Sequence, residues 1–168
     1  MTPLLFSLRP HYANLVFEGL KKFELRRRGL TLMRGREVFV YVTSPVGKLR
    51  GGFQVGEVRT GTPEVIWEVV ANSACIEKAD FDTYYAGRDI AYALEITEVW
   101  EYSNPVDLSK LRESFQKFVA PQSWRYVKPE EHELFLQMER DRLDKENRLE
   151  SERTWSGQTT LLPQGVLS

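Results

Sequence analysis

The stretch GLKKFELRRR, residues 19–28, combines a glycine, five basic residues and a single glutamate, Glu24. Within it Phe23 and Leu25 alternate with charged residues, which is the period-two pattern of a half-buried strand. If both apolar side chains face the core, Glu24 and Arg26 lie side by side on the opposite face. The stretch is therefore predicted to be a strand with one charged face.

Short strands and helices are predicted on both sides of this stretch. Residues 4–9 have strand composition, and residues 10–20 carry apolar side chains at helical spacing. Pro10 suits the first turn of that helix and Gly19 its C-terminal stop. Further strands are predicted at residues 37–45, 48–61 and 90–102, and further helices at residues 62–70 and 78–89.

Three glycines interrupt the strand predicted at residues 48–61, namely Gly51, Gly52 and Gly56. Glycines inside a strand indicate a bulge or the bend of a barrel corner. Short strands with glycine-bearing turns and few helices predict an α+β fold, a small mixed β-barrel with two or three short helices.

The character of the chain changes at Pro129, after which the sequence is highly charged. We expect one domain over residues 1–128, a charged helix over residues 129–153 and a flexible or partner-bound tail over residues 154–168. A thin apolar stripe that includes Leu134 and Met138 predicts that the first half of the helix packs on the domain.

The composition is that of an ordinary globular protein, with 42% hydrophobic and 28% charged residues in a chain of 168. No apolar run approaches the roughly 20 residues that span a bilayer, so no membrane partner is expected. Cys75 is the only cysteine, which excludes an intrachain disulfide and a cysteine-based metal cluster. We expect Cys75 to be half-buried and the protein to be cytoplasmic.

Charge is distributed unevenly along the sequence. Residues 1–61 contain eleven basic and four acidic residues, a net charge of +7, whereas the remainder carries 12 basic and 20 acidic residues, a net charge of −8. An asymmetry of this kind is typical of a polyanion-binding face.

The pattern Gly19-x-Lys21-x-x-Glu24-x-Arg26 resembles the GxKxxExR signature of the ASCH family, relatives of the PUA domain with an RNA-binding type of β-barrel. FVYVTSP, GGFQVGEV and PQSWRY resemble its archaeal and bacterial branch, so the likeness spans residues 4–127. The resemblance implies a PUA-like barrel with a cleft for a nucleobase or nucleotide, lined by Lys21, Glu24 and Arg26.

The chemistry of these three side chains fits such a ligand. A carboxylate accepts from the amine or ring N–H of a base, whereas arginine offers a planar fork of donors and lysine a compact charge for a phosphate. The alternative is a surface Glu–Arg pair, which contributes about 0–1 kcal/mol.

Other candidates surround this trio. Ser7, Arg9 and Ser44 fall at predicted strand ends, and the PQSWRY stretch adds Ser123 and Arg125; a serine there contacts a base or only satisfies a turn. Lys22, Arg27 and Arg28 form a phosphate track, or are solvated charges at a strand end. Tyr126 is expected in the core, and Trp124 either stacks on a base or fills the core. Trp67, Tyr84 and Tyr85 are expected to be packing residues.

Three functions remain open. The first is an RNA- or modified-nucleotide-binding module. The second is a hydrolase using Lys21 and Glu24, of the ribonuclease or acyl-cytidine amidohydrolase type, although the small amidohydrolases of the superfamily carry a threonine where Glu24 stands. The third is an adaptor that binds a protein through the C-terminal helix and tail. We expect no cofactor and no metal, because no glycine-rich phosphate loop appears and His11 and His132 lack metal-ligand spacing.

Overall fold

The computed structural model describes residues 1–28, 32–138 and 140–142, the last three by their backbone alone. The strands are β1 Leu4–Leu8, β2 Phe23–Arg26, β3 Glu37–Val42, β4 Lys48–Gly61, β5 Ala91–Asp107, β6 Trp124–Tyr126 and β7 Arg140–Arg142. The helices are α1 Pro10–Phe17, α2 Pro63–Val70, α3 Lys78–Tyr85, α4 Leu108–Ser114 and α5 Pro129–Gln137.

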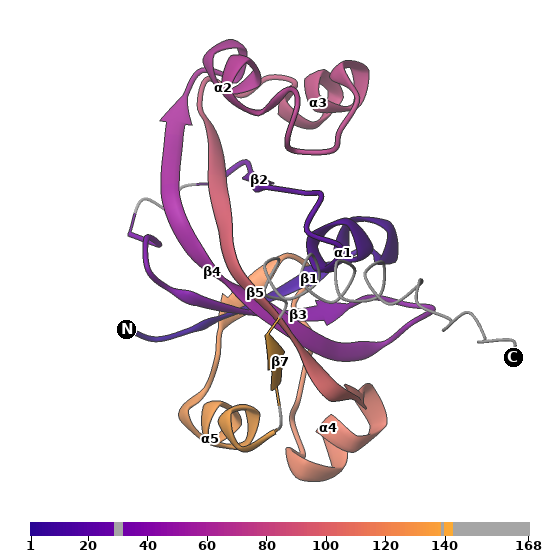
Figure 1. The fold of residues 1–168 in the computed structure, drawn as a ribbon. Helices are drawn as coiled ribbons and strands as arrows, with labels where there is room; N and C mark the ends of the chain where they lie inside the picture. Colours follow the sequence, from indigo (N-terminus) through magenta and orange to yellow (C-terminus); the bar gives the residue numbers. More distant parts are fainter. Residues whose placement is uncertain (29–31, 139, 143–168) are drawn as a thin grey trace, which may run out of the picture.

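The strands form one curled sheet in the order β2-β5-β4-β3-β1-β6, with β7 added beside β5 (Figure 1). β1 and β3 are parallel and the other pairs are antiparallel. α1 and β2 provide the long connection that a parallel pair requires. The predicted mixed barrel is confirmed as a curled half-barrel, in which β2 and β6 are the two ends of the strand order.

Glycines in β4 allow the sheet to curl. The register between β4 and β5 shifts at Leu49/Gly51, Gly52/Gln54 and Val55/Val58. A Cβ at Gly51 would lie 2.2 Å from the Trp100 carbonyl oxygen, and one at Gly52 would lie 2.2 Å from the Val38 carbonyl oxygen. The bulged, glycine-dependent bend predicted from the sequence is therefore confirmed.

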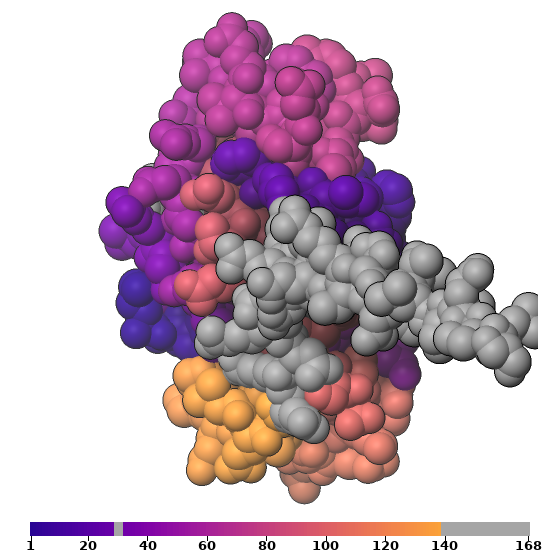
Figure 2. All heavy atoms as spheres, viewed as in Figure 1, coloured from indigo at the N-terminus to yellow at the C-terminus, as the bar shows by residue number. Residues whose placement is uncertain are grey.

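Three hydrophobic clusters hold the fold together. The first lies on the inner face of the half-barrel and includes Phe6, Val40 and Leu94 together with Val16 of α1. The second lies on the opposite face and includes Leu5, Phe39, Leu111 of α4 and Phe135 of α5. The third lies where α2 and α3 cover β2 and β5, and includes Leu25, Ile66, Phe81 and Ala93. Figures 1 and 2 show α2 with α3 at one end of the molecule and α4 with α5 at the other.

The helices differ from the expectation in number and length. α4 was not predicted, and α5 ends at Gln137, well before residue 153. β7 follows α5 and pairs with β5, while residues 143–168, including the tail predicted at 154–168, lie outside the described residues. A protein-binding role for that segment stays a prediction. No helix in the described part of the chain is long and apolar enough to cross a membrane.

Candidate functional site

The end of α1 sets the position of Lys21. Gly19 has a positive φ of 70°, a conformation that glycine adopts without steric cost, and it stops the helix as predicted. The backbone N–H of Lys21 then donates to the Leu15 carbonyl at 2.9 Å, which turns the chain toward β2. The Lys21 side chain is only 4% exposed.

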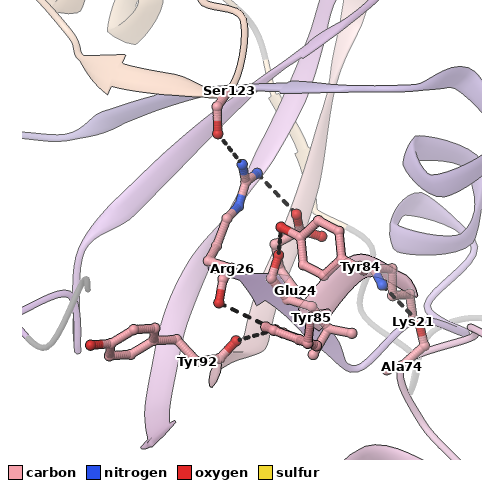
Figure 3. A network of polar contacts seen from close by, with 9 residues as sticks. Lys21, Glu24, Arg26, Ala74, Tyr84, Tyr85, Tyr92 and Ser123 are labelled. Atoms are coloured by element: carbon pink, nitrogen blue, oxygen red, sulfur yellow. Dashed lines mark hydrogen bonds and ion pairs between the residues drawn. The ribbon is translucent and has the colours of Figure 1, made fainter. Parts of the chain in front are cut away.

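Glu24 and Arg26 form an ion pair on β2 (Figure 3). Arg26 Nη2 lies 2.9 Å from Glu24 Oε1, and each side chain is 9% exposed. The guanidinium carbon of Arg26 lies 4.1 Å from the ring centroid of Phe6, so the cation covers an aromatic ring of the inner core. The two charges lie side by side as predicted, but they are buried, which rules out the alternative of a solvated surface pair.

The guanidinium of Arg26 is incompletely satisfied. Nη1 donates to Ser123 Oγ at 2.8 Å. Nε and Nη2 are buried and have no partner in hydrogen-bond geometry, so the close approach of Nη2 to Glu24 is a charge contact without a well-aligned hydrogen bond. Leaving a buried donor unsatisfied costs about 1–3 kcal/mol, more for a charged group. The site therefore retains donor capacity that the protein itself does not use.

Ser7 and Ser123 are brought together beside this guanidinium. The backbone N–H of Ser7 donates to the Ser123 carbonyl at 3.0 Å, and Ser7 Oγ donates to the Pro121 carbonyl at 2.5 Å. Ser7 thus fixes the loop that presents Ser123 to Arg26. The Ser7 hydroxyl satisfies the backbone, which was the structural alternative predicted for such serines.

Lys21 lies within the electrostatic reach of the pair. Its Nζ donates to the Ala74 carbonyl at 2.7 Å and lies 5.3 Å from the ring centroid of Tyr12. Burial lowers the pKa of Lys21, an effect that the negative charge of Glu24 opposes and the positive charge of Arg26 reinforces. Lys21 therefore loses its proton at a lower pH than an exposed lysine does.

Two tyrosines of α3 hold the backbone of β2, a role that the sequence did not reveal. Tyr85 donates to the carbonyls of Arg26 and Tyr92 at 3.2 Å each, and Tyr84 donates to the Leu25 carbonyl at 3.2 Å. Burial raises the pKa of both phenols, so both remain neutral donors at neutral pH. No local pattern points to this role, because it depends on α3 folding back over β2.

Arg125 lies on the other face of the sheet. It pairs with Leu5, whose side chain belongs to the cluster beneath α4 and α5. Its guanidinium contacts the carboxylate of Glu131 at 2.7 and 2.8 Å, and Glu131 is 1% exposed. Arg125 thus ties β6 to α5 and does not join Arg26, and its predicted contact with a nucleotide stays a prediction.

Arg9 and Ser44 lie at the ends of two neighbouring strands. Arg9 is exposed and precedes α1, and Ser44 is exposed in the turn after β3. The backbone N–H of Thr43 donates to the Leu8 carbonyl at 2.9 Å, which places these strand ends together. Nothing in the described structure links either side chain to the Arg26 cluster, and their ligand contacts stay predictions.

The predicted phosphate track divides into buried and exposed parts. Lys22 is half-buried, and its backbone bonds to Ser73 and Ile96. Arg27 and Arg28 are exposed just beyond β2. The guanidinium carbon of Arg27 lies 4.8 Å from the ring centroid of Tyr84. Arg27 and Arg28 are therefore open to solvent, and their contacts with phosphates stay predictions.

The aromatic residues of β6 differ from the expectation. Tyr126 was predicted to lie in the core but is 51% exposed, so that prediction is wrong. β6 is a three-residue strand at the edge of the sheet, and the core does not extend over its last residue. Trp124 is half-buried and packs against the inner cluster.

The histidines do not join the site. His11 stacks edge-on against Tyr12, and His132 Nε2 lies 3.7 Å from Glu37 Oε2. Among the described residues, no group of three or more His, Cys, Asp or Glu side chains is placed to hold a metal ion.

Two known proteins match most of the chain. The large ribosomal subunit protein uL22 of Ureaplasma parvum serovar 3 is 31% identical over 125 residues, which are 74% of this chain and 39% of that protein. This chain therefore spans about two fifths of the length of that relative. The ASCH domain-containing ribonuclease of Zymomonas mobilis is 26% identical over 125 residues, which are 74% of this chain and 84% of that protein.

Structural similarity agrees with the sequence matches. The crystal structure of ASCH from Zymomonas mobilis has a TM-score of 0.75 at 24% identity and covers 81% of this chain and 94% of that one. The shared fold confirms the prediction of a PUA-like mixed barrel. The family model for the ASCH domain matches residues 6–133, which are most of the sequence. The chain therefore belongs to the ASCH domain family.

Proposed function

We propose that the protein binds RNA or a modified nucleotide at the cluster of Lys21, Glu24, Arg26 and Ser123. The observation that supports this most strongly is the buried guanidinium of Arg26, whose Nε and Nη2 have no hydrogen-bond partner in the protein. A buried polar group without a partner calls for an explanation such as a ligand absent from the structure. A nucleobase or phosphate that displaces the groups covering these two buried atoms supplies the missing acceptors.

The donors and acceptors of the cluster match the edge of a base. The Nε and Nη2 hydrogens of an arginine point in parallel and can meet two acceptors at once, such as phosphate oxygens or the O6 and N7 atoms of guanine. The carboxylate of Glu24 only accepts, so it selects a base N–H. Unstacked bases of single-stranded RNA expose such edges, whereas an RNA duplex encloses the O6 and N7 atoms in a deep, narrow major groove that side chains cannot read.

Charge and family membership agree with this proposal. The net charge of +7 in residues 1–61 is carried by the part of the chain that contains the cluster. Arg27 and Arg28 lie just beyond β2 and are suited to phosphate contacts, which position a nucleic acid without specifying its sequence. Two relatives have names connected with RNA, a ribonuclease and a large ribosomal subunit protein.

Binding of fluorescent single-stranded oligoribonucleotides, measured by anisotropy at several salt concentrations, tests the proposal. Affinity should fall as salt rises, because phosphate contacts release counterions. Arg26→Met and the isosteric Glu24→Gln should each lower affinity about tenfold or more, since hydrogen bonds to charged groups contribute about 1.5–3 kcal/mol.

Arg88→Met is the matched control, because Arg88 is exposed and its replacement removes the same charge. Circular dichroism establishes that each variant is folded. If folded Arg26→Met and Glu24→Gln proteins bind as tightly as the wild type, the proposed site is wrong.

RNA cleavage is a second candidate function, favoured by the lowered pKa of Lys21 and by the ribonuclease relative. A neutral Lys21 amine can accept the proton of a ribose 2′-hydroxyl as that oxygen attacks the adjacent phosphorus. The phosphorus–O5′ bond then breaks, and the leaving oxygen takes up a proton from water or from the Lys21 ammonium that formed in the first step. In this candidate reaction the guanidinium of Arg26 stabilises the charge that develops on the phosphate.

Lys21→Arg separates cleavage from binding. Arginine keeps the positive charge but is not deprotonated near neutral pH, so it can attract a phosphate without acting as a base. If Lys21 is the base, this variant binds RNA and cleaves no labelled oligoribonucleotide. Cleavage at the wild-type rate by Lys21→Arg would exclude Lys21 from that role.

A further inference from the structure

The edge strand β6 carries two aromatic side chains on the face of the sheet that contains the cluster. Trp124 pairs with Phe6, the ring beneath Arg26, and Tyr126 pairs with Leu4 of the same inner cluster. Side chains alternate along a strand, so Trp124 and Tyr126 share this face and Arg125 points to the other. Within the described residues, β6 has β1 as its only strand partner, which leaves its outer edge open.

Tyr126 is exposed although aromatic neighbours and an arginine surround it. Its ring centroid lies 5.7 Å from that of Trp124 in an edge-to-face arrangement with an interplanar angle of 86°. The guanidinium carbon of Arg36 lies 5.8 Å from the Tyr126 ring centroid. With both contacts made, Tyr126 still exposes 51% of its surface.

Arg36 is held in place beside this ring. Its Nε donates to the Leu32 carbonyl at 3.0 Å, and its Nη1 donates to the Thr2 carbonyl at 2.6 Å. Both acceptors are neutral, so the positive charge of Arg36 is not cancelled by these bonds. An aromatic ring beside a fixed arginine is the combination that single-stranded nucleic-acid sites use for stacking and phosphate contact.

The surface formed by Trp124 and Tyr126 adjoins the Arg26 cluster. Ser123, which accepts the hydrogen bond from Arg26 Nη1, directly precedes Trp124 in the chain. Ser123 lies in the bend before β6, and at the rise of an extended chain its α-carbon lies up to about 10 Å from that of Tyr126. That span is longer than one base, so a ligand that reaches both places contains more than one nucleotide.

We infer that the ligand is a single strand of RNA that runs along the edge of β6, with one base at Glu24 and Arg26 and a following base stacked on Tyr126. Arg36 contacts the phosphate backbone beside that second base. The inference rests on the proposed function and adds that the ligand is an oligonucleotide instead of a free nucleotide. It also assigns Tyr126 and Arg36 to a second subsite.

A comparison of ligand lengths tests the inference. The probes are the four ribonucleoside 5′-monophosphates and a mixed-sequence pentaribonucleotide with 2′-O-methyl groups, which prevent cleavage by the 2′-hydroxyl. Isothermal titration calorimetry measures their affinity for the wild type and for Tyr126→Ala, Tyr126→Phe and Leu136→Ala. Leu136 is an exposed apolar residue of α5, 54% exposed, and serves as the matched control.

The pentanucleotide should bind at least tenfold more tightly than any mononucleotide. Tyr126→Ala should weaken pentanucleotide binding about 5- to 100-fold, the range for loss of one base–aromatic stack. It should leave mononucleotide binding unchanged, while Tyr126→Phe and Leu136→Ala bind like the wild type. Equal affinity for the two ligand lengths, or no effect of Tyr126→Ala on the pentanucleotide, would overturn the second subsite but not the first. Failure of the wild type to bind either ligand would overturn both proposals.

Discussion

Arg26 Nη1 donates to Ser123 Oγ at 2.8 Å, and this bond connects the two ends of the sheet. Arg26 is the last residue of β2, and Ser123 immediately precedes β6. The candidate ligand-binding guanidinium is thus also a link between the edges of the half-barrel. A ligand that engages Arg26 acts at the place where the two edges approach each other.

The Glu24–Arg26 pair should show strong energetic coupling. Removing either partner leaves a buried charge uncompensated, so Glu24→Gln and Arg26→Met should each destabilise the fold by about 3–5 kcal/mol. The double variant should lose clearly less than the sum of the two. Urea unfolding of the wild type, the two single variants and the double variant measures the coupling free energy in a double-mutant cycle.

Arg34 and Glu57 provide a surface pair for comparison, with side chains 74% and 43% exposed. Their coupling should stay below about 1 kcal/mol. If the coupling of Glu24 and Arg26 is equally small, the pair is not buried as the structure shows.

Lys21 should make stability depend on pH. Its pKa in the folded protein lies below its usual value near 10.5, so between those two values the folded state binds fewer protons than the unfolded state. Stability then rises with pH in this window, by at most about 1.4 kcal/mol per pH unit, and the gain is lost as pH falls through the folded pKa. Lys21→Met lacks this dependence.

The wild type should therefore gain stability relative to Lys21→Met when urea unfolding is compared between pH 7 and pH 10. Tyrosine ionisation at high pH is common to both proteins and cancels in the difference. Parallel stability curves for the two proteins would show that Lys21 titrates like an exposed lysine.

Gly52 should tolerate no side chain. A Cβ there would lie 2.2 Å from the Val38 carbonyl oxygen and 2.5 Å from the Trp100 ring, so Gly52→Ala forces backbone movement in β3 or β4. We expect a loss of several kcal/mol, above the roughly 1–3 kcal/mol typical of overpacking. Gly61→Ala is the control, because its nearest contact is a Val65 methyl group at 3.2 Å. Similar thermal midpoints for the two variants would contradict the close packing of β4.

Replacing Arg125 should lower the stability of the fold without changing the affinity for RNA. Arg125→Met leaves the carboxylate of Glu131, which is 1% exposed, without its partner, at an expected cost of about 3 kcal/mol. Because Arg125 lies on the face opposite Arg26, the folded variant should bind oligoribonucleotides with wild-type affinity. A large loss of affinity for oligoribonucleotides in a folded Arg125→Met variant would show that Arg125 belongs to the binding site.

Much of the local structure was predictable, because it depends on short-range rules. The alternation in GLKKFELRRR places Glu24 beside Arg26, and the glycines of residues 48–61 mark the bulges of β4. These patterns act within one strand. They predict the face of the strand on which a side chain lies, but they do not predict which other elements pack over that face.

The remaining features depend on contacts between distant segments. Ser123 meets Arg26 across 97 residues of sequence, and the two tyrosines of α3 reach β2 across 59 residues. Arg125 lies on the face opposite Arg26 because one step along β6 moves a side chain to the other face, and its contact with a nucleotide stays a prediction. Tyr126 was misassigned because the sequence does not show that the strand ends at the rim of the core.

The resonance of the Arg26 Nε–H group offers the most direct test of the central claim. A ¹H–¹⁵N spectrum tuned to arginine side chains, assigned with the Arg26→Lys variant, follows this group during titration with the 2′-O-methyl pentanucleotide. A ligand acceptor at Nε should shift the signal strongly, while the Arg125 signal stays in place. If the pentanucleotide binds and the Arg26 Nε–H signal does not move, the ligand lies elsewhere and the proposed site is wrong.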